Sequence, residues 1–213
     1  IALSLAGVLT LAGCSSAVDQ AGGDGPVDGG VLRIGDSGDL TPATIYTGTP
    51  AQATVTGLVY DTLVSYPPDT LDPQPELAES WEVTPDGTTV TLALRDDVTF
   101  HDGRPFTSAD VEFSLRTYAD PVRAGQLAGT AALVTDYDTT DPHAITLHLS
   151  RPAANFFDLL DIVPIIDANT LAGFQDGTVY NGTGPFRFVE WKPGSSITFE
   201  ANPGYWGGAP HLD

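Results

Sequence analysis

Apolar and polar positions alternate most regularly in residues 89–94 (TVTLAL), where every second side chain is a valine or a leucine. This period of two is that of a half-buried β-strand. A second extended segment, which includes residues 81–83, precedes this strand. Between them, residues 84–87 (TPDG) hold a proline, which sets one turn dihedral, and a glycine, which accepts a positive one. We therefore predict two strands joined by a tight turn.

A helix is predicted after these strands. Residues 102–103 (DG) mark another tight turn, and residues 107–110 (TSAD) have the pattern of a helix start whose carboxylate reaches back to the first turn. Val111, Leu115 and Tyr118 then recur at the spacing of one helical face.

The rest of the chain contains shorter elements of both kinds, and no internal repeat. Helices are predicted at residues 51–63 and 155–162. Strands are predicted at residues 31–34, 133–137, 144–149, 186–191 and 196–200, the last two joined by a turn at residues 192–195. The chain is therefore predicted to be α/β.

Several spaced motifs carry a resemblance to a known family. The central segment contains, in order, LAESWE, PDG, LRDDVTFHDG and SADV (residues 77–111), and it resembles the extracytoplasmic solute-binding proteins of the peptide/nickel ABC-importer family, bacterial solute-binding protein family 5. Residues 58–64 (LVYDTLV), 182–186 (GTGPF) and 202–206 (NPGYW) are similar to further family elements. Phe186 departs from the family pattern, which has tyrosine there.

The resemblance implies a periplasmic-binding-protein-like type II fold with two lobes. Residues 31–57 and 174–213 would form the core of the first lobe, and residues 58–173 the subdomain that distinguishes the family. Because the chain stops just after NPGYW, we expect an N-terminal fragment with the second lobe absent.

The first residues (IALSLAGVLTLAGCSS) are predicted to lie outside the fold. Their apolar run is shorter than the ~20 residues that span a bilayer, and it is typical of a secretory signal, with residues 1–13 as its remnant. LAGC resembles a lipobox, so Cys14, the only cysteine, is predicted to be acylated. An ordinary signal peptide is the alternative. Residues 14–30, rich in Gly, Asp and Ser, are predicted to be a flexible tether.

Composition excludes some functions. The net charge is -20, from 28 acidic and 8 basic residues, which disfavours nucleic acid as a partner and suits solubility outside the cell. With Cys14 acylated, no disulfide or thiolate metal site is available to the fold. We predict no metal, no cofactor and no catalytic residue.

The loop after the first predicted strand is the main candidate for ligand contact. It follows a strand end, where open sheets place ligands, its carboxylates could accept cationic groups, and its backbone could pair with an extended peptide. A solvated acidic turn is the alternative. Weaker candidates are a tyrosine and a threonine at the rim of the cleft. The predicted ligand-binding residues are thus Gly35, Asp36, Ser37, Asp39, Tyr46 and Thr183.

Other chemistry is less favoured. His101-Asp102 could suggest acid–base or metal work, but a carboxylate beside a glycine in a turn more often bonds the backbone. Trp81 is predicted to anchor the core rather than to stack on a ligand, and Trp191 and Trp206 likewise.

The resemblance implies a lipid-anchored binding component of an ABC importer on the extracytoplasmic face of the cell membrane. It would capture oligopeptides or dipeptides and deliver them to permease subunits. The alternatives are a family member that binds a nickel chelate, haem or a sugar, a surface signalling or adhesion lipoprotein, and an extracellular hydrolase using His101 and Asp102.

Overall fold

The computed structural model describes residues 28–42, 46, 50–123 and 125–213; Cys14 and the predicted signal segment lie outside them. The chain is α/β, as predicted. In that described part, no helix is long and apolar enough to cross a bilayer. The elements in chain order are α1 (Pro50–Val59), β1 (Val64–Ser65), β2 (Gln74–Pro75), β3 (Ala78–Val83), β4 (Thr89–Leu94), α2 (Ser108–Ala119), η3 (Pro121–Arg123), α3 (Ala128–Ala131), β5 (Val134–Asp138), β6 (Ala144–Leu149), α4 (Phe156–Ile162), η4 (Ala168–Thr170), α5 (Leu171–Asp176), β7 (Phe186–Lys192) and β8 (Ser196–Ala201).

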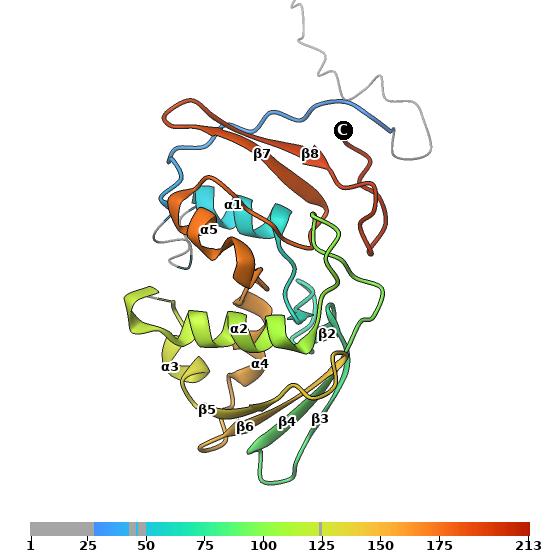
Figure 1. Cartoon of the computed structure of the whole chain (residues 1–213), viewed down its shortest axis with the longest axis vertical. Coiled ribbons are helices and arrows are strands. Elements are labelled where there is room, and N and C mark those ends of the chain that lie inside the picture. The colour runs from blue at the N-terminus through green and yellow to red at the C-terminus, as the bar shows by residue number, and fades with distance from the viewer. Residues whose placement is uncertain (1–27, 43–45, 47–49, 124) are drawn as a thin grey trace, which may run out of the picture.

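An antiparallel sheet of order β3-β4-β6-β5 forms one end of the molecule (Figure 1). In β4 the apolar positions Val90, Leu92 and Leu94 are buried, which confirms the predicted alternation. The turn predicted at residues 84–87 connects the antiparallel neighbours β3 and β4, and the predicted strands at residues 133–137 and 144–149 pair as β5 and β6.

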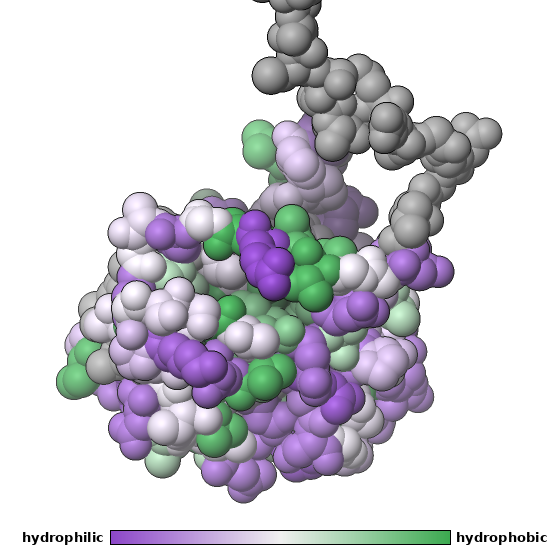
Figure 2. Space-filling model, turned by 90° about the horizontal axis from the view of Figure 1, so that it is seen from above, coloured by the Kyte–Doolittle hydropathy of each residue, from purple (hydrophilic) through white to green (hydrophobic). Residues whose placement is uncertain are grey.

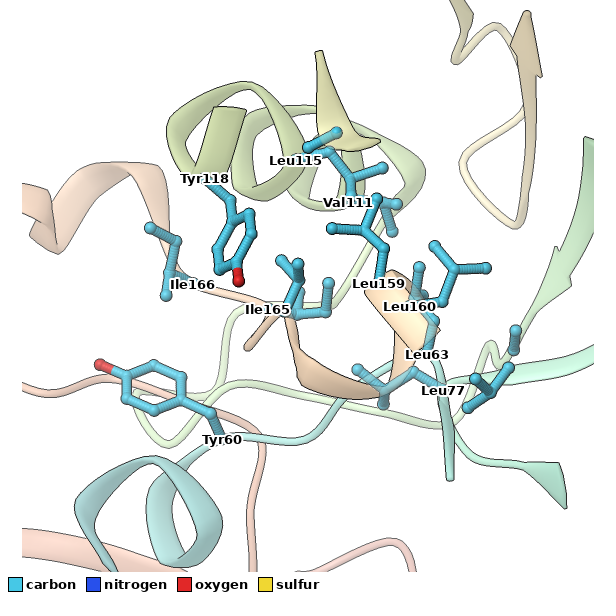
Figure 3. Packing of buried hydrophobic residues seen from close by; sticks show 14 of the residues in the cluster. Tyr60, Leu63, Leu77, Val111, Leu115, Tyr118, Leu159, Leu160, Ile165 and Ile166 are labelled. Carbon is cyan, nitrogen blue, oxygen red and sulfur yellow. The ribbon is translucent and has the colours of Figure 1, made fainter. Parts of the chain in front are cut away.

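The helix α2 begins where the sequence pattern predicts. The Asp110 carboxylate accepts hydrogen bonds from the backbone N–H of Thr107 at 2.9 Å and from its hydroxyl at 3.1 Å, so the first turn of the helix is capped by its own side chains. Val111, Leu115 and Tyr118 are all buried. They pack against residues from the segments after α1 and around α4, in a continuous apolar core (Figure 3).

The β7–β8 hairpin lies at the other end, over α1 and α5 (Figure 1). Its turn contains Gly194 at φ +68°, a left-handed conformation that favours glycine, and the pairing Phe188↔Phe199 sits within the ladder. This hairpin and the α4 helix confirm the predictions at residues 186–200 and 155–162.

Two element predictions are wrong. Residues 31–34 form no strand, because no described strand supplies ladder partners for them. Val31, Leu32 and Ile34 are accordingly 71%, 63% and 73% exposed. The helix predicted at residues 51–63 ends at Val59. Beyond it, backbone groups of Thr62 and Leu63 pair with residues 77, 78 and 160, so tertiary pairing overrides helical continuation.

Candidate functional site

The predicted ligand loop, residues 35–39, lies at the surface at the β7–β8 end of the molecule. Gly35 and Ser37 are exposed, and the Asp36 carboxylate accepts a hydrogen bond from the Gly38 N–H at 3.0 Å. Figure 2 looks onto this end and shows apolar surface interspersed with hydrophilic surface. The loop is therefore accessible to a ligand, and Asp36 stabilises a local turn within it.

Asp39 has a different role from its neighbours in this loop. Its carboxylate accepts hydrogen bonds from the Gly194 N–H at 2.7 Å, and from the Trp191 indole N–H and the Leu40 N–H, both at 2.8 Å. These donors, in that order, lower the pKa of Asp39 below its ordinary value. Asp39 thus fastens the loop to the turn of the β7–β8 hairpin, across more than 150 residues of chain.

Tyr46 lies in the interior rather than at a rim. Its side chain is 7% exposed, and its ring packs edge-on against Tyr118 at 5.1 Å between centroids and near Phe174 at 5.9 Å. The hydroxyl is buried with no hydrogen-bond partner among the residues that the structure describes. Burial raises the pKa of Tyr46.

Thr183 is 1% exposed, and its hydroxyl donates to Asp61 Oδ2 at 2.7 Å. The same carboxylate accepts hydrogen bonds from Tyr205 Oη at 3.0 Å and Trp206 Nε1 at 2.9 Å. Asp61 therefore joins the end of α1 to two later segments. The six predicted residues thus occupy three environments: an exposed loop, the aromatic core and the Asp61 cluster.

Glycine is required where the chain passes α1. A Cβ on Gly182 would lie 1.9 Å from the Val59 carbonyl oxygen, and one on Gly184 would lie 2.8 Å from the Leu58 oxygen. The Gly184 N–H donates to the same Val59 oxygen at 2.9 Å. The GTG motif therefore serves close backbone approach, which brings Thr183 to Asp61.

A hollow of about 390 Å³ opens beside this cluster, lined by Tyr60, Asp61, Glu76, Asp161 and Tyr205 among others. Burial first, and then the charges of Asp61 and Asp161, raise the pKa of Glu76. Burial, followed by the charge of nearby Asp158, likewise raises the pKa of Asp161. Within the described residues no three His, Cys, Asp or Glu side chains could hold a metal ion together.

The His101 turn joins the sheet end of the molecule to the GTG segment. His101 Nε2 donates to the Gly184 carbonyl at 2.9 Å, and the His101 N–H donates to the Gly182 carbonyl at 2.8 Å. Asp102 Oδ1 accepts from the Arg104 N–H at 3.0 Å, which confirms the turn interpretation. Burial lowers the pKa of His101. The pair is thus a structural contact between segments.

Sequence reasoning missed Asp61. The elements LVYDTLV and NPGYW are similar to family motifs, but nothing in either indicates that the aspartate of the first and the tryptophan of the second meet. Trp191 was placed correctly as an anchor: its ring packs against the core while its N–H bonds Asp39. Trp81 likewise packs on Phe157, with ring centroids 5.3 Å apart.

Comparison with known proteins gives consistent similarities. A profile of the bacterial extracellular solute-binding proteins, family 5 middle, matches residues 72–213. The dipeptide-binding protein of Escherichia coli is 33% identical over 181 residues, covering 73% of this chain and 34% of that protein. Heme-binding protein A of Haemophilus influenzae is 32% identical over 200 residues, covering 82% and 36%.

Among solved structures, the oligopeptide-binding protein AppA from Bacillus subtilis, in complex with a nonapeptide, has a TM-score of 0.77 and 27% identity. That match covers 89% of this chain and 40% of AppA. The chain thus spans well under half the length of these proteins: 28% of the first curated relatives and 40% of AppA.

Proposed function

The chain belongs to the bacterial extracellular solute-binding proteins of family 5, and we propose that it is part of the substrate-binding component of an ABC importer. Its α/β fold is that of the type II periplasmic binding proteins. In this proposal the protein captures oligopeptides or dipeptides outside the cell and delivers them to permease transmembrane subunits. Capture works by stabilising a closed state, without covalent chemistry.

The observation that carries the peptide proposal is the similarity to AppA, whose structure holds a nonapeptide, over 89% of this chain. The dipeptide-binding relative of E. coli supports the same class of ligand. An extended peptide needs hydrogen-bond partners for its backbone, and the exposed loop of residues 35–39 offers such groups beside the β7–β8 hairpin.

The predicted contact residues take separate roles in this proposal. Gly35, Asp36 and Ser37 contact the ligand directly, because they are exposed. Asp39 holds their loop against the hairpin. Tyr46 acts from the aromatic core, where it packs on Tyr118 and Phe174, and Thr183 acts through the Asp61 cluster.

The wider organisation is proposed on the same basis. Residues 31–57 and 174–213 form the lobe core, and residues 58–173 form the family-specific subdomain. Cys14 carries the lipid that anchors the protein to the extracytoplasmic face of the membrane. An acylated cysteine with several chains holds firmly, because each buried methylene contributes about 0.8 kcal/mol.

Haem is the second candidate ligand, because heme-binding protein A is also a relative. Binding of a nickel chelate or a sugar would keep the fold and change the ligand. A signalling or adhesion role would keep the fold without transport. Isothermal titration of the full-length protein with a dipeptide, a nonapeptide and haem distinguishes these outcomes. Peptide binding in the micromolar range or tighter supports the proposal, whereas binding of haem alone replaces the ligand.

A further inference from the structure

A second hollow lies beside α3. Figure 1 shows α3 in the half of the molecule that lies away from the β7–β8 hairpin. Its volume is about 360 Å³. Residues 126–133, which include α3, form one side, and residues 151–155, which lead into α4, form the other. It therefore shares no residue with the loop or the Asp61 cluster.

The charge of this hollow is unlike that of the rest of the chain. Its lining contains Arg151 and no aspartate or glutamate, in a protein with 28 acidic and 8 basic residues. All eight basic residues lie in the described ranges. Five hydrogen-bond to an acidic or amide side chain: Arg95 to Asp97, Arg104 to Asp110 and Asp167, Arg116 to Glu112, Arg187 to Asn202 and Lys192 to Glu190. The guanidinium of a sixth, Arg123, lies against the side-chain amide of Gln175.

Only Arg33 and Arg151 have neither an acidic nor an amide side-chain partner among the described residues. Both residues are exposed, but Arg33 lies in the extended segment of residues 31–34, whereas Arg151 lines a hollow. An arginine guanidinium presents five N–H donors in a planar fork that matches a carboxylate. Within the described residues the fork of Arg151 has no hydrogen-bond partner.

The neighbouring polar groups offer donors as well, beside the amide oxygens of Gln126 and Asn155. Asn155 Nδ2 donates to Thr130 Oγ1 at 3.1 Å, which occupies an acceptor site of that hydroxyl. The Thr130 O–H hydrogen and the second Asn155 N–H then have no acceptor among the described residues. Three donor groups, one of them charged, thus line a hollow without any acid.

We propose that this hollow binds a carboxylate group, with Arg151 as its bidentate partner and Thr130 and Asn155 as additional donors. Its volume is at the lower end of the range for small-ligand pockets, about 300–1,000 Å³, so it suits a small carboxylate or one acidic side chain of a partner. The net charge of -20 opposes the approach of any anion, so short-range charge-assisted hydrogen bonds must supply the affinity.

The chain offers matched variants for a test. Arg151→Gln removes the fork. Arg33→Gln removes the same charge from the other unpaired arginine, outside the hollow. Gly129→Leu adds bulk to the wall of the hollow and keeps Arg151, and there is room to start the side chain because a Cβ on Gly129 would meet nothing within 4 Å. Thermal unfolding of each variant checks that the fold is kept.

The experiment titrates the full-length protein with glutarate, with its neutral analogue glutaramide, and with a capped peptide containing one glutamate, followed by amide NMR shifts and calorimetry. We expect glutarate or the peptide, but not glutaramide, to shift resonances of residues 126–133 and 151–155. Arg151→Gln should weaken binding about tenfold, Gly129→Leu should abolish it, and Arg33→Gln should leave it unchanged.

Binding of glutarate identifies a free carboxylate as the ligand, and binding of the peptide alone identifies an acidic side chain of a partner. The proposal is overturned if neither probe binds. It is also overturned if Arg151→Gln binds as tightly as the unaltered protein, or if both arginine variants weaken binding equally, since bulk charge would then explain the effect.

Discussion

The carboxylate of Asp61 accepts a hydrogen bond of 2.9 Å from the indole N–H of Trp206, 145 residues further along the chain. The same carboxylate also binds Thr183 and Tyr205. Three donors from two segments therefore converge on one side chain just after α1. This cluster holds the parts of the chain that lead into and out of the β7–β8 hairpin.

Removing the Asp61 carboxylate should destabilise the protein. Asp61→Ala leaves three donors without their acceptor, and each buried donor left unpaired costs about 1–3 kcal/mol. Because Tyr205 and Trp206 are only partly buried, we expect a loss of about 3 kcal/mol in the free energy of unfolding, measured in urea. Asp61→Asn keeps one acceptor oxygen and should lose less. Equal stability of Asp61→Ala and the unaltered protein would contradict the role of this cluster.

Gly182 should be intolerant of any side chain. A Cβ there would overlap the Val59 carbonyl oxygen, so Gly182→Ala should cost about 3 kcal/mol or prevent folding. Gly57→Ala is the matched control, because it lies in α1 with nothing within 4 Å of its Cβ. That variant should be more stable by about 0.5–1 kcal/mol, because alanine favours helix. Similar unfolding midpoints for the two variants would count against the close approach.

Stability should fall in acid, in part through Asp167. Burial alone would raise the pKa of this carboxyl, but hydrogen bonds from Asn181 and the Asn169 N–H, together with the Arg104 charge, outweigh it and lower the pKa below 3.8. Because the folded-state pKa is the lower one, this contribution is complete above pH 3.8 and is lost as pH falls through the folded-state value.

Asp167→Asn should therefore be less stable at neutral pH and should lose less stability than the unaltered protein on acidification to about pH 2, as measured by urea unfolding at each pH. If the free energy of unfolding falls equally with pH for both proteins in this range, Asp167 does not contribute to the loss of stability in acid.

The Asp39 carboxylate should affect ligand binding more than stability. Asp39→Ala removes the bonds to Trp191 and Gly194 that fix the exposed loop, and a looser loop loses more entropy when it orders on a ligand. We expect about tenfold weaker peptide binding by calorimetry and a nearly unchanged melting temperature. Asp36→Ala, which removes only the bond to the Gly38 N–H in the same loop, tests direct contact instead. Unchanged affinity in both variants would exclude this loop from the site.

Local patterns predicted the parts of the fold that depend on local interactions. The alternation in residues 89–94 and the capping residues 107–110 each specify their element within a few positions, and both were confirmed. The segment 31–34 also has a strand pattern, yet a strand needs a neighbour, and its sequence says nothing about which segment lies beside it. The end of α1 at Val59 was missed for the same reason, since the pairing partners of Thr62 and Leu63 are distant.

The candidate site was less predictable, because its key contacts join residues far apart in sequence. An aspartate in a loop after a strand could be solvated, contact a ligand or cap another loop, and only the position of Gly194 decides for Asp39. A tyrosine has an apolar ring and a polar tip, so Tyr46 could lie at a rim or in the core. The hydrogen bonds of Asp61 to Thr183, Tyr205 and Trp206 depend on the path of the chain through space, which no local motif encodes.

The most direct test of peptide capture is native mass spectrometry of the full-length protein, purified without added ligand and then mixed with a peptide library. The proposed function predicts bound species whose added masses correspond to peptides, and their release and sequencing give the preferred length. A protein that carries only haem or another single small molecule, and that ignores the library, would contradict the assignment of peptides as its cargo.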